Sequence, residues 1–127
     1  MSKVGSTSEH LVNVESLSAS LQRFADDRDW RQFHSPKNLL LALTGEVGEL
    51  CEIFQWMSEA DSVEAAKRPE TAQAVKDELA DVLMYLVRLA SVLDVDLNEA
   101  TKNKLALNGL KYPVDKAKST SKKYDQL

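Results

Sequence analysis

Apolar residues recur at helical spacing along most of this chain, and no segment shows the alternating pattern typical of a β-strand. The spacing predicts four main helices and one polar connecting loop over residues 58–68. The expected helices run over residues 14–29, 36–57 and 69–93, and from Asp96 to near Gly109 or Pro113. The expected fold class is therefore all-α, with a four-helix-bundle-like arrangement.

Two of these helices have clear start signals. Ser35 is a favourable N-cap residue, and Pro36 follows at the first helical position, where proline is tolerated. Asp96 is followed three residues later by Glu99, a capping-box arrangement with Asp in place of Ser or Thr. We therefore expect helices to begin at these two points.

The length of 127 residues is that of one domain. We expect residues 1–13 to be disordered, residues 14–113 to form the domain, and residues 114–127 to form a flexible basic tail. Residues 111–127 hold five lysines and two aspartates, a net charge of +3, so the rest must carry −7 to give the total of −4. This distribution fits either an acidic site that gathers cations or a solvated acidic surface with a frayed tail.

Composition excludes several classes of protein. A net charge of −4 argues against a protein that mainly coats nucleic acid, which needs a strongly basic surface. No apolar run is long enough to cross a membrane, and the polar first ten residues do not form a secretory signal. The single cysteine, Cys51, cannot form an internal disulfide. We expect a soluble, cytoplasmic protein.

The third predicted helix is apolar nearly all round from Val82 to Leu93, with Arg88 as its only charged residue. A helix without a polar face must be covered on several sides, and four helices of one small chain cover a central helix poorly. We therefore expect a homo-oligomer with this helix inside. The alternative is a helix that is covered entirely within its own chain.

Four acidic residues form two pairs at i, i+3 spacing, Glu46 with Glu49 and Glu78 with Asp81. Such a pair lies on one helix face, and most exposed acidic pairs only mark a solvated face. These pairs, however, fall inside the apolar stripes that should face the core. Ionised carboxylates there cost several kcal/mol each unless protons or cations compensate them, and neither stripe has a basic residue close by.

A divalent metal is the simplest compensation. Neither stripe contains a histidine or a thiolate ligand, and oxygen ligands alone select Mg²⁺ or Mn²⁺ over zinc or copper. A di-iron centre would need Glu-x-x-His pairs, which are absent. Magnesium with open coordination positions suits a polyphosphate ligand and can activate a water molecule.

Gly45 and Gly48 lie beside the first acidic pair, in the interior of the second predicted helix. Each costs roughly 1 kcal/mol relative to alanine in that position. They allow either another backbone or a ligand to approach closely, or they serve tight packing between helices.

The two acidic motifs, Glu46-x-x-Glu49 and Glu78-x-x-Asp81, occur together with further sequence blocks in a fixed order. These blocks are Arg28-Asp29-Trp30, Gln32-Phe33-His34, Asn38-Leu39-Leu40-Leu41-Ala42-Leu43, Gly45-Glu46-Val47-Gly48-Glu49-Leu50, Phe54-Gln55-Trp56, Glu78-Leu79-x-Asp81-Val82-Leu83-x-Tyr85-Leu86 and Lys104-x-x-x-Asn108-x-x-x-Tyr112-Pro113. Over roughly residues 14–125 the chain resembles the MazG-like all-α NTP pyrophosphatases, and within them the dCTP pyrophosphatase branch.

The resemblance implies a Mg²⁺-dependent hydrolase that converts a (d)NTP to the (d)NMP and pyrophosphate and so removes unwanted nucleotides from the pool. The first candidate substrate is dCTP or a modified dCTP. It also implies a helical homo-oligomer, commonly a tetramer built as a dimer of dimers. The implied metal ligands and catalytic residues are Glu46, Glu49, Glu78 and Asp81. The implied substrate-binding residues are Trp30, His34, Trp56 and Tyr85 towards the nucleoside and Lys104, Asn108, Lys111 and Tyr112 towards the phosphates, together with Asn38.

The spacing is compatible with these implied roles. Trp56 lies seven residues after Glu49, and Tyr85 lies seven residues after Glu78, so each acidic face extends into an aromatic residue two turns onward. An aromatic ring there could stack on a base. The plainer alternatives are aromatic residues of the core, a solvated lysine face on the fourth helix, and a surface His34.

The resemblance departs at Leu21, where the dCTP-preferring enzymes are expected to carry a histidine of the nucleoside pocket. The substrate therefore stays open between dCTP and another nucleotide, such as dUTP or an oxidised or methylated one. A non-catalytic helical module whose acidic residues bind a basic partner is the alternative from another class. For the hydrolase, we expect Mg²⁺ to bridge the acidic residues and the phosphates. A metal-bound water then attacks the α-phosphorus, and Glu49 is the first choice to align or deprotonate that water.

Overall fold

Helices are the main elements of the computed structural model, which describes residues 12–127. In chain order they are α1 (Val14–Asp27), α2 (Pro36–Phe54), α3 (Glu59–Val63), α4 (Ala72–Val92), α5 (Leu97–Lys111) and α6 (Val114–Ala117), with single 3₁₀ turns at Arg31–Phe33 and Tyr124–Gln126. No strand occurs in residues 12–127, and the predicted all-α class is confirmed.

Both predicted helix starts are confirmed by their capping hydrogen bonds. The Ser35 hydroxyl accepts from the Asn38 amide at 3.2 Å, directly before Pro36 opens α2. The Asp96 carboxylate accepts from the Glu99 amide, also at 3.2 Å, at the start of α5. Each cap satisfies one of the amide groups that the first turn of a helix leaves without a partner.

The segment between α2 and α4 differs from the prediction. The loop expected over residues 58–68 contains the short helix α3, because Ser58 caps it by accepting from the Asp61 amide at 3.1 Å. The third long helix begins at Ala72 rather than at residue 69. The turn before it is closed by Thr71, whose hydroxyl donates to the Ala65 carbonyl at 2.6 Å.

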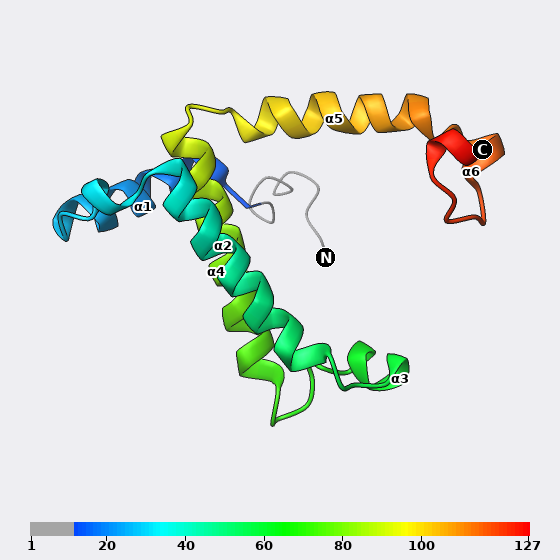
Figure 1. Ribbon diagram of the computed structural model, residues 1–127, viewed down its shortest axis with the longest axis horizontal. Coiled ribbons are helices and arrows are strands. Elements are labelled where there is room, and N and C mark those ends of the chain that lie inside the picture. The colour runs from blue at the N-terminus through cyan, green and yellow to red at the C-terminus, as the bar shows by residue number, and fades with distance from the viewer. Residues whose placement is uncertain (1–11) are drawn as a thin grey trace, which may run out of the picture. The chain divides into compact units, whose positions relative to one another are not determined.

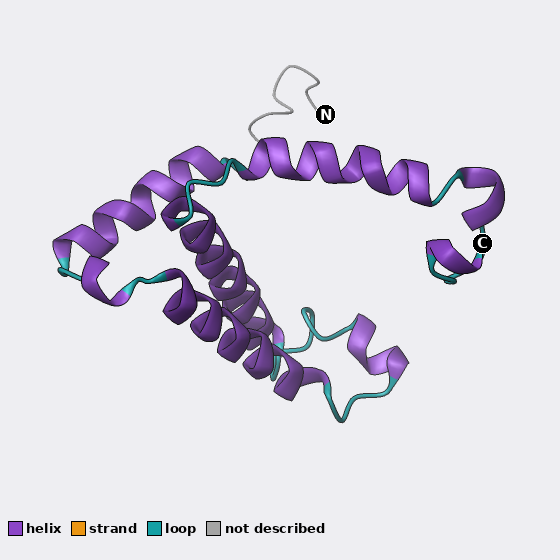
Figure 2. Cartoon of the chain, turned by 45° about the horizontal axis from the view of Figure 1, so that its top comes forward, coloured by secondary structure: helices purple, strands orange, loops and turns teal. Residues whose placement is uncertain are grey.

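Helices α2 and α4 lie side by side and run in opposite directions (Figures 1 and 2). They form the main packing contact of the chain, and α1 packs against α4 as well. The core between them includes Leu39 of α2 and Val75 and Val87 of α4, all buried, with Ala25 on α1. This pairing holds the two predicted acidic motifs on facing helices.

The chain divides into two compact units, with the boundary between Asp94 and Val95. In the second unit, the ring of Tyr124 meets that of Tyr112 edge-on at 6.2 Å, and the Lys111 ammonium lies 4.7 Å from the centre of the Tyr124 ring. The tail over residues 114–127, expected to be flexible, thus contains α6 and a 3₁₀ turn that contacts the end of α5. The expected disorder of residues 1–13 falls almost entirely outside the described residues, and the predicted domain limits stay a prediction.

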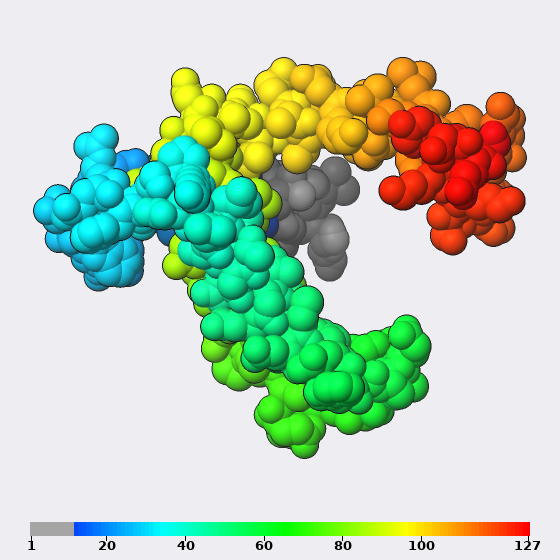
Figure 3. All heavy atoms as spheres, viewed as in Figure 1, coloured from blue at the N-terminus to red at the C-terminus, as the bar shows by residue number. Residues whose placement is uncertain are grey.

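Large apolar side chains remain uncovered on the α2–α4 pair. In the space-filling view of Figure 3, α2 forms the front of the first unit, and no other element of that unit lies over it. Leu40 and Leu41 on α2 are exposed, while Leu79 and Leu86 on α4 are 53% and 41% exposed. The described part of the chain therefore does not cover α4 completely. None of its helices combines the length and apolar character needed to cross a bilayer.

Candidate functional site

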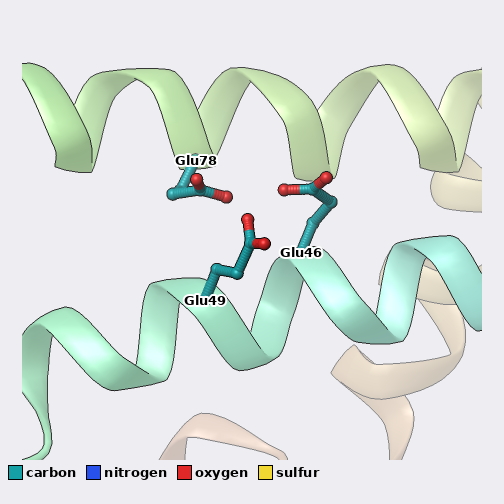
Figure 4. Close-up of side chains that lie close together, drawn as sticks. All are labelled: Glu46, Glu49 and Glu78. Carbon is teal, nitrogen blue, oxygen red and sulfur yellow. The ribbon is translucent and has the colours of Figure 1, made fainter.

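Three carboxylates meet between α2 and α4. Glu46 and Glu49 point from α2 towards α4, and Glu78 points back from α4, as Figure 4 shows. One oxygen of each residue lies within 4.8 Å of the others. The spacing of three residues places Glu46 and Glu49 on one face of α2, and the antiparallel packing brings Glu78 opposite them. We call these three residues the acidic cluster.

The acidic cluster lacks compensating charge and hydrogen-bond donors. Glu46 Oε2 and Glu78 Oε2 are buried and have no hydrogen-bond partner. Ionised carboxylates are acceptors only, so the three groups cannot satisfy one another. The ion pairs among residues 12–127 all lie elsewhere and involve Asp26, Asp61 and Glu64.

This crowding changes the acidity of Glu46. Its pKa is raised to about 7, mainly because a protonated Glu46 could donate to the neighbouring Glu78 carboxylate. Burial, which disfavours the ionised form, contributes next, followed by the hydrogen bond and the repulsion offered by Glu49. The cluster therefore keeps a proton near neutral pH unless a cation takes its place. Buried carboxylate oxygens without donors fit a hard divalent cation, which accepts oxygen ligands.

Asp81, the fourth predicted ligand, is not part of the acidic cluster among the described residues. It lies one turn beyond Glu78 on α4 and lines an adjoining pocket of about 330 Å³. The pocket walls come from α1, from the connection between α1 and α2, and from α4. The lining residues are Leu21, Phe24, Trp30, His34, Asp81, Met84, Tyr85 and Arg88.

The pocket is mostly apolar and aromatic. Trp30 meets Phe24 edge-on at a ring distance of 5.7 Å and His34 at 6.2 Å. Tyr85 lies in the wall contributed by α4. Such a pocket, with a few polar groups among flat rings, suits a planar aromatic ligand.

Arg88 is a pocket residue that sequence reasoning noticed but gave no role. It is only 5% exposed. Its Nε donates to His34 Nδ1 at 3.0 Å, and its Nη1 donates to Gln22 Oε1 at 2.6 Å. Burial, and then the Arg88 charge, lower the pKa of His34. The available signal was a single charge on an otherwise apolar helix segment, but its partners lie 54 and 66 residues away in sequence.

Comparison with known proteins agrees with this architecture. The MazG-like family profile matches residues 42–127. This chain belongs to the MazG-like family. Its relatives include dCTP pyrophosphatase 1 of Rattus norvegicus, 50% identical over 104 residues, and that of Homo sapiens, 49% identical over the same length. The aligned region covers 82% of this chain but 61% of each of these relatives.

A solved structure supports the same assignment. The crystal structure of a pyrophosphatase from Archaeoglobus fulgidus superposes with a TM-score of 0.73 at 41% sequence identity. The superposition covers 82% of this chain and 95% of that one. The family membership and the dCTP pyrophosphatase resemblance expected from the sequence blocks are therefore confirmed.

The remaining predicted residues of this MazG-like chain lie outside the pocket lining. The Asn38 side chain donates to the Phe33 carbonyl at 3.1 Å, so it stabilises the start of α2. Trp56 follows α2 and is 90% exposed. A further group belongs to the second unit, at the positions Lys104, Asn108, Lys111 and Tyr112. The structure thus brings Trp30, His34, Asp81 and Tyr85 together around one pocket, beside the acidic cluster.

Proposed function

We propose that this chain is a nucleoside triphosphate pyrophosphohydrolase that converts a (d)NTP and water to the (d)NMP and pyrophosphate, with dCTP or a modified dCTP as the first candidate. One observation carries the proposal: the acidic cluster and the aromatic pocket share α4. Glu78, Asp81 and Tyr85 follow one another along that helix at one-turn steps. At about 1.5 Å per residue, Glu78 and Tyr85 are roughly 10 Å apart along the axis. That separation suits phosphates at one end and a base at the other.

The acidic cluster, together with Asp81, would hold Mg²⁺ or Mn²⁺. The donor set fits, because it offers only carboxylate oxygens, two of which are buried without any donor. When bound, the metal would neutralise phosphate charge and make a water molecule more acidic. The nature of the ion and the four-residue ligand set are part of the proposal.

The three carboxylates of the acidic cluster would have different roles. Glu49 is the exposed member of the acidic cluster, so it is the carboxylate best placed to align a water molecule and accept its proton. Glu46 and Glu78 are less accessible and would serve as ligands. Without a cation, all three would repel the negatively charged triphosphate, and the substrate would not remain bound.

The pocket would hold the nucleoside. Trp30 and Tyr85 offer rings for stacking on the base, and Leu21 contributes an apolar wall where a histidine was expected. We assign Asn38 and Trp56 to substrate binding on the family resemblance alone. For the phosphates, we propose the face of α5 on which Lys104, Asn108 and Lys111 recur at i, i+4 and i+7, with Tyr112 at its end.

We propose that the protein acts as a homo-oligomer, with a tetramer as the first candidate. The partly exposed Leu79 and Leu86 on α4 and the largely exposed Trp56 support this, because isolated chains seldom leave so many large apolar groups in water. A second copy covering them would also account for the apolar character of the 82–93 segment.

The deciding experiment is a panel of canonical and modified nucleoside triphosphates, assayed with Mg²⁺ and read for pyrophosphate and orthophosphate separately. The proposal predicts pyrophosphate and the monophosphate as first products, with dCTP or a modified dCTP among the best substrates. Omitting the metal, or adding a chelator, should stop the reaction. Orthophosphate as the first product, or metal-independent turnover, would contradict the proposal.

A further inference from the structure

The buried Arg88 lacks the partner that a buried arginine usually has. A buried guanidinium normally pairs with a carboxylate, because an unpaired charge in the interior is strongly disfavoured. Arg88 instead donates to two neutral acceptors, Gln22 Oε1 and His34 Nδ1. It lies in the pocket wall, and no ion pair among the described residues includes it. The fold therefore satisfies this buried cation with neutral acceptors rather than with a carboxylate.

This contact fixes the chemical form of His34. A guanidinium has only donors, so the Nδ1 atom that accepts from Arg88 must carry a lone pair. The ring proton then resides on Nε2, which makes Nε2–H a donor. Burial and the Arg88 charge both lower the His34 pKa, so the ring stays neutral at pH 7. The charged groups near this ring are Arg88 itself and Asp81 in the same pocket wall, while Asp26 and Arg31 act on Arg88.

The donor lies in a pocket with few other polar groups. Most of the lining is aromatic or aliphatic, and Asp81 is its one acidic residue. No hydrogen bond from His34 Nε2 to a described residue occurs. An unmatched donor in an apolar pocket favours ligands that carry an acceptor there and penalises ligands that do not.

We propose that Arg88, braced by Gln22, is a positioning residue that holds His34 as an Nε2–H donor, and that this donor selects nucleobases with a ring carbonyl oxygen over adenine, which has none. The inference rests on the proposed function in one respect, namely that the pocket binds a nucleoside. It adds that the pocket prefers cytosine, uracil and guanine over adenine. This preference is assigned to three side chains, Gln22 on α1, His34 in the α1–α2 connection and Arg88 on α4.

The first test reads the state of the ring directly. The chain has two histidines, so a His10→Gln background leaves His34 as the only imidazole signal in long-range ¹H–¹⁵N NMR spectra. We expect one neutral tautomer at pH 7, with the proton on Nε2. Arg88→Met should produce a mixture of the two tautomers, and Gln22→Met a smaller change in the same direction. A proton on Nδ1 in the unsubstituted protein would overturn the inference.

The second test measures selection with deoxynucleosides, which carry no phosphate. Binding of deoxycytidine, deoxyuridine, deoxyguanosine and deoxyadenosine is compared by titration calorimetry or by NMR shifts. Arg88→Met should weaken binding of the first three by about tenfold and leave deoxyadenosine within about twofold, since adenine makes no such hydrogen bond. Arg23→Met is the matched control, because Arg23 is exposed on α1 and, among the described residues, hydrogen-bonds to Ser20 alone. It should change none of the four affinities.

Two milder variants keep the proposal testable if Arg88→Met does not fold. Gln22→Met removes one brace, and Arg88→Lys keeps the charge but offers one nitrogen in place of two separated donors. Both should reduce selection by less than Arg88→Met. A purely structural Arg88 would lower the melting temperature without changing the ratio of affinities, and that result would overturn the inference.

The two proposals fail in different ways. If the protein hydrolyses no triphosphate but its nucleoside selection depends on Arg88, the proposed function is wrong and the selection rule stands. If it hydrolyses triphosphates but selection is unchanged in Arg88→Met and Gln22→Met, the selection rule is wrong and the proposed function stands. Equal weakening of all four deoxynucleosides would also overturn the rule.

Discussion

The two ends of the α2–α4 pair handle buried charge in opposite ways. At the acidic cluster, three carboxylates lie within 4.8 Å of one another, and two of their oxygens have no donor. Near the C-terminal end of α4, the buried Arg88 is matched by acceptors from two other segments. One end is incomplete within the described chain, whereas the other is satisfied by the chain itself.

This difference indicates what each end is for. A charge that the fold satisfies with its own groups contributes to holding helices in place, and its removal leaves unpaired partners behind. Charges that the fold leaves uncompensated destabilise it, so they are retained where an external ion or ligand completes them. The same substitution strategy, removal of one charge, should therefore stabilise the apo protein at the acidic cluster and destabilise it at Arg88.

The largest expected effect is on turnover, at the acidic end. Glu78→Ala should lower kcat for the best triphosphate at least about a hundredfold, because it removes a carboxylate that would hold the metal. Helix content, followed by circular dichroism, should not change. In the absence of metal, the free energy of unfolding of the variant should be about 1 kcal/mol higher than that of the parent, because a source of repulsion between carboxylates is removed.

Glu52→Ala is the matched control for this prediction. Glu52 is an exposed acid on the same helix as Glu49, one turn onward, and it is not part of the acidic cluster. Its removal should leave turnover within about twofold, as expected for a solvated surface carboxylate. Full activity of Glu78→Ala would remove the metal-site proposal altogether.

The opposite end should respond with a loss of stability. Arg88→Met should lower the free energy of unfolding by about 2 kcal/mol, because His34 Nδ1 and Gln22 Oε1 both lose their donor inside the protein. Denaturant unfolding of the metal-free protein measures this, with Arg23→Met as the unchanged reference. A stabilised Arg88→Met would mean that the guanidinium is as poorly compensated as the acidic cluster, and the contrast between the two ends would disappear.

Local sequence signals predicted most of the fold. The Ser35-Pro36 and Asp96-to-Glu99 patterns gave two helix starts, because capping depends on neighbouring residues only. The same locality explains the acidic pair on α2, since spacing of three residues fixes a common face. The short helix α3 was missed, because five residues carry too little apolar periodicity to be recognised, although Ser58 is an ordinary N-cap.

Contacts between distant segments could not be predicted in this way. The contact of Arg88 with His34 spans 54 residues and depends on how α1 and α4 pack. Spacing alone placed Asp81 with Glu78. In the structure Asp81 lines the pocket and is not one of the three clustered carboxylates, and its part in the ligand set stays a prediction. The spacing also linked Trp56 to Glu49. Trp56 follows the end of α2 and is 90% exposed in the described chain, and its role in substrate binding stays a prediction.

A further prediction concerns the pH dependence of the acidic end. The Glu46 pKa is raised from 4.5 to about 7 in the folded chain, so the folded state binds more protons than the unfolded state between these values. Folding stability without metal should therefore fall as pH rises from about 4.5 to 7, and the loss should be complete above pH 7. Mg²⁺ should consequently raise the melting temperature more at pH 8 than at pH 5.

Glu46→Gln isolates this effect, because a neutral amide cannot ionise. When a chelator removes metal, the difference in melting temperature between this variant and the parent should increase in favour of the variant from pH 5 to pH 8. Glu52→Gln serves as the reference, since that side chain is exposed and separate from the cluster. A constant difference across this range would mean that Glu46 titrates as an ordinary carboxyl.

The smallest expected effect tests why glycines stand next to the acidic cluster. A Cβ added at Gly45 or Gly48 would meet no atom of the described residues within 4 Å, other than the adjacent backbone of α2, so tight packing within this chain does not require them. Alanine at either position should then stabilise a separate chain by up to about 1 kcal/mol, as Gly109→Ala should in α5, where the space is equally open.

Thermal unfolding and light scattering on the three variants, Gly45→Ala, Gly48→Ala and Gly109→Ala, distinguish close approach of a second copy from the other roles of these glycines. If Gly45→Ala or Gly48→Ala lowers both the assembled mass and the melting temperature while Gly109→Ala does not, a second copy approaches α2 beside the acidic cluster. A higher melting temperature in all three variants, with an unchanged assembled mass, would show that assembly does not use the face of α2 beside the acidic cluster.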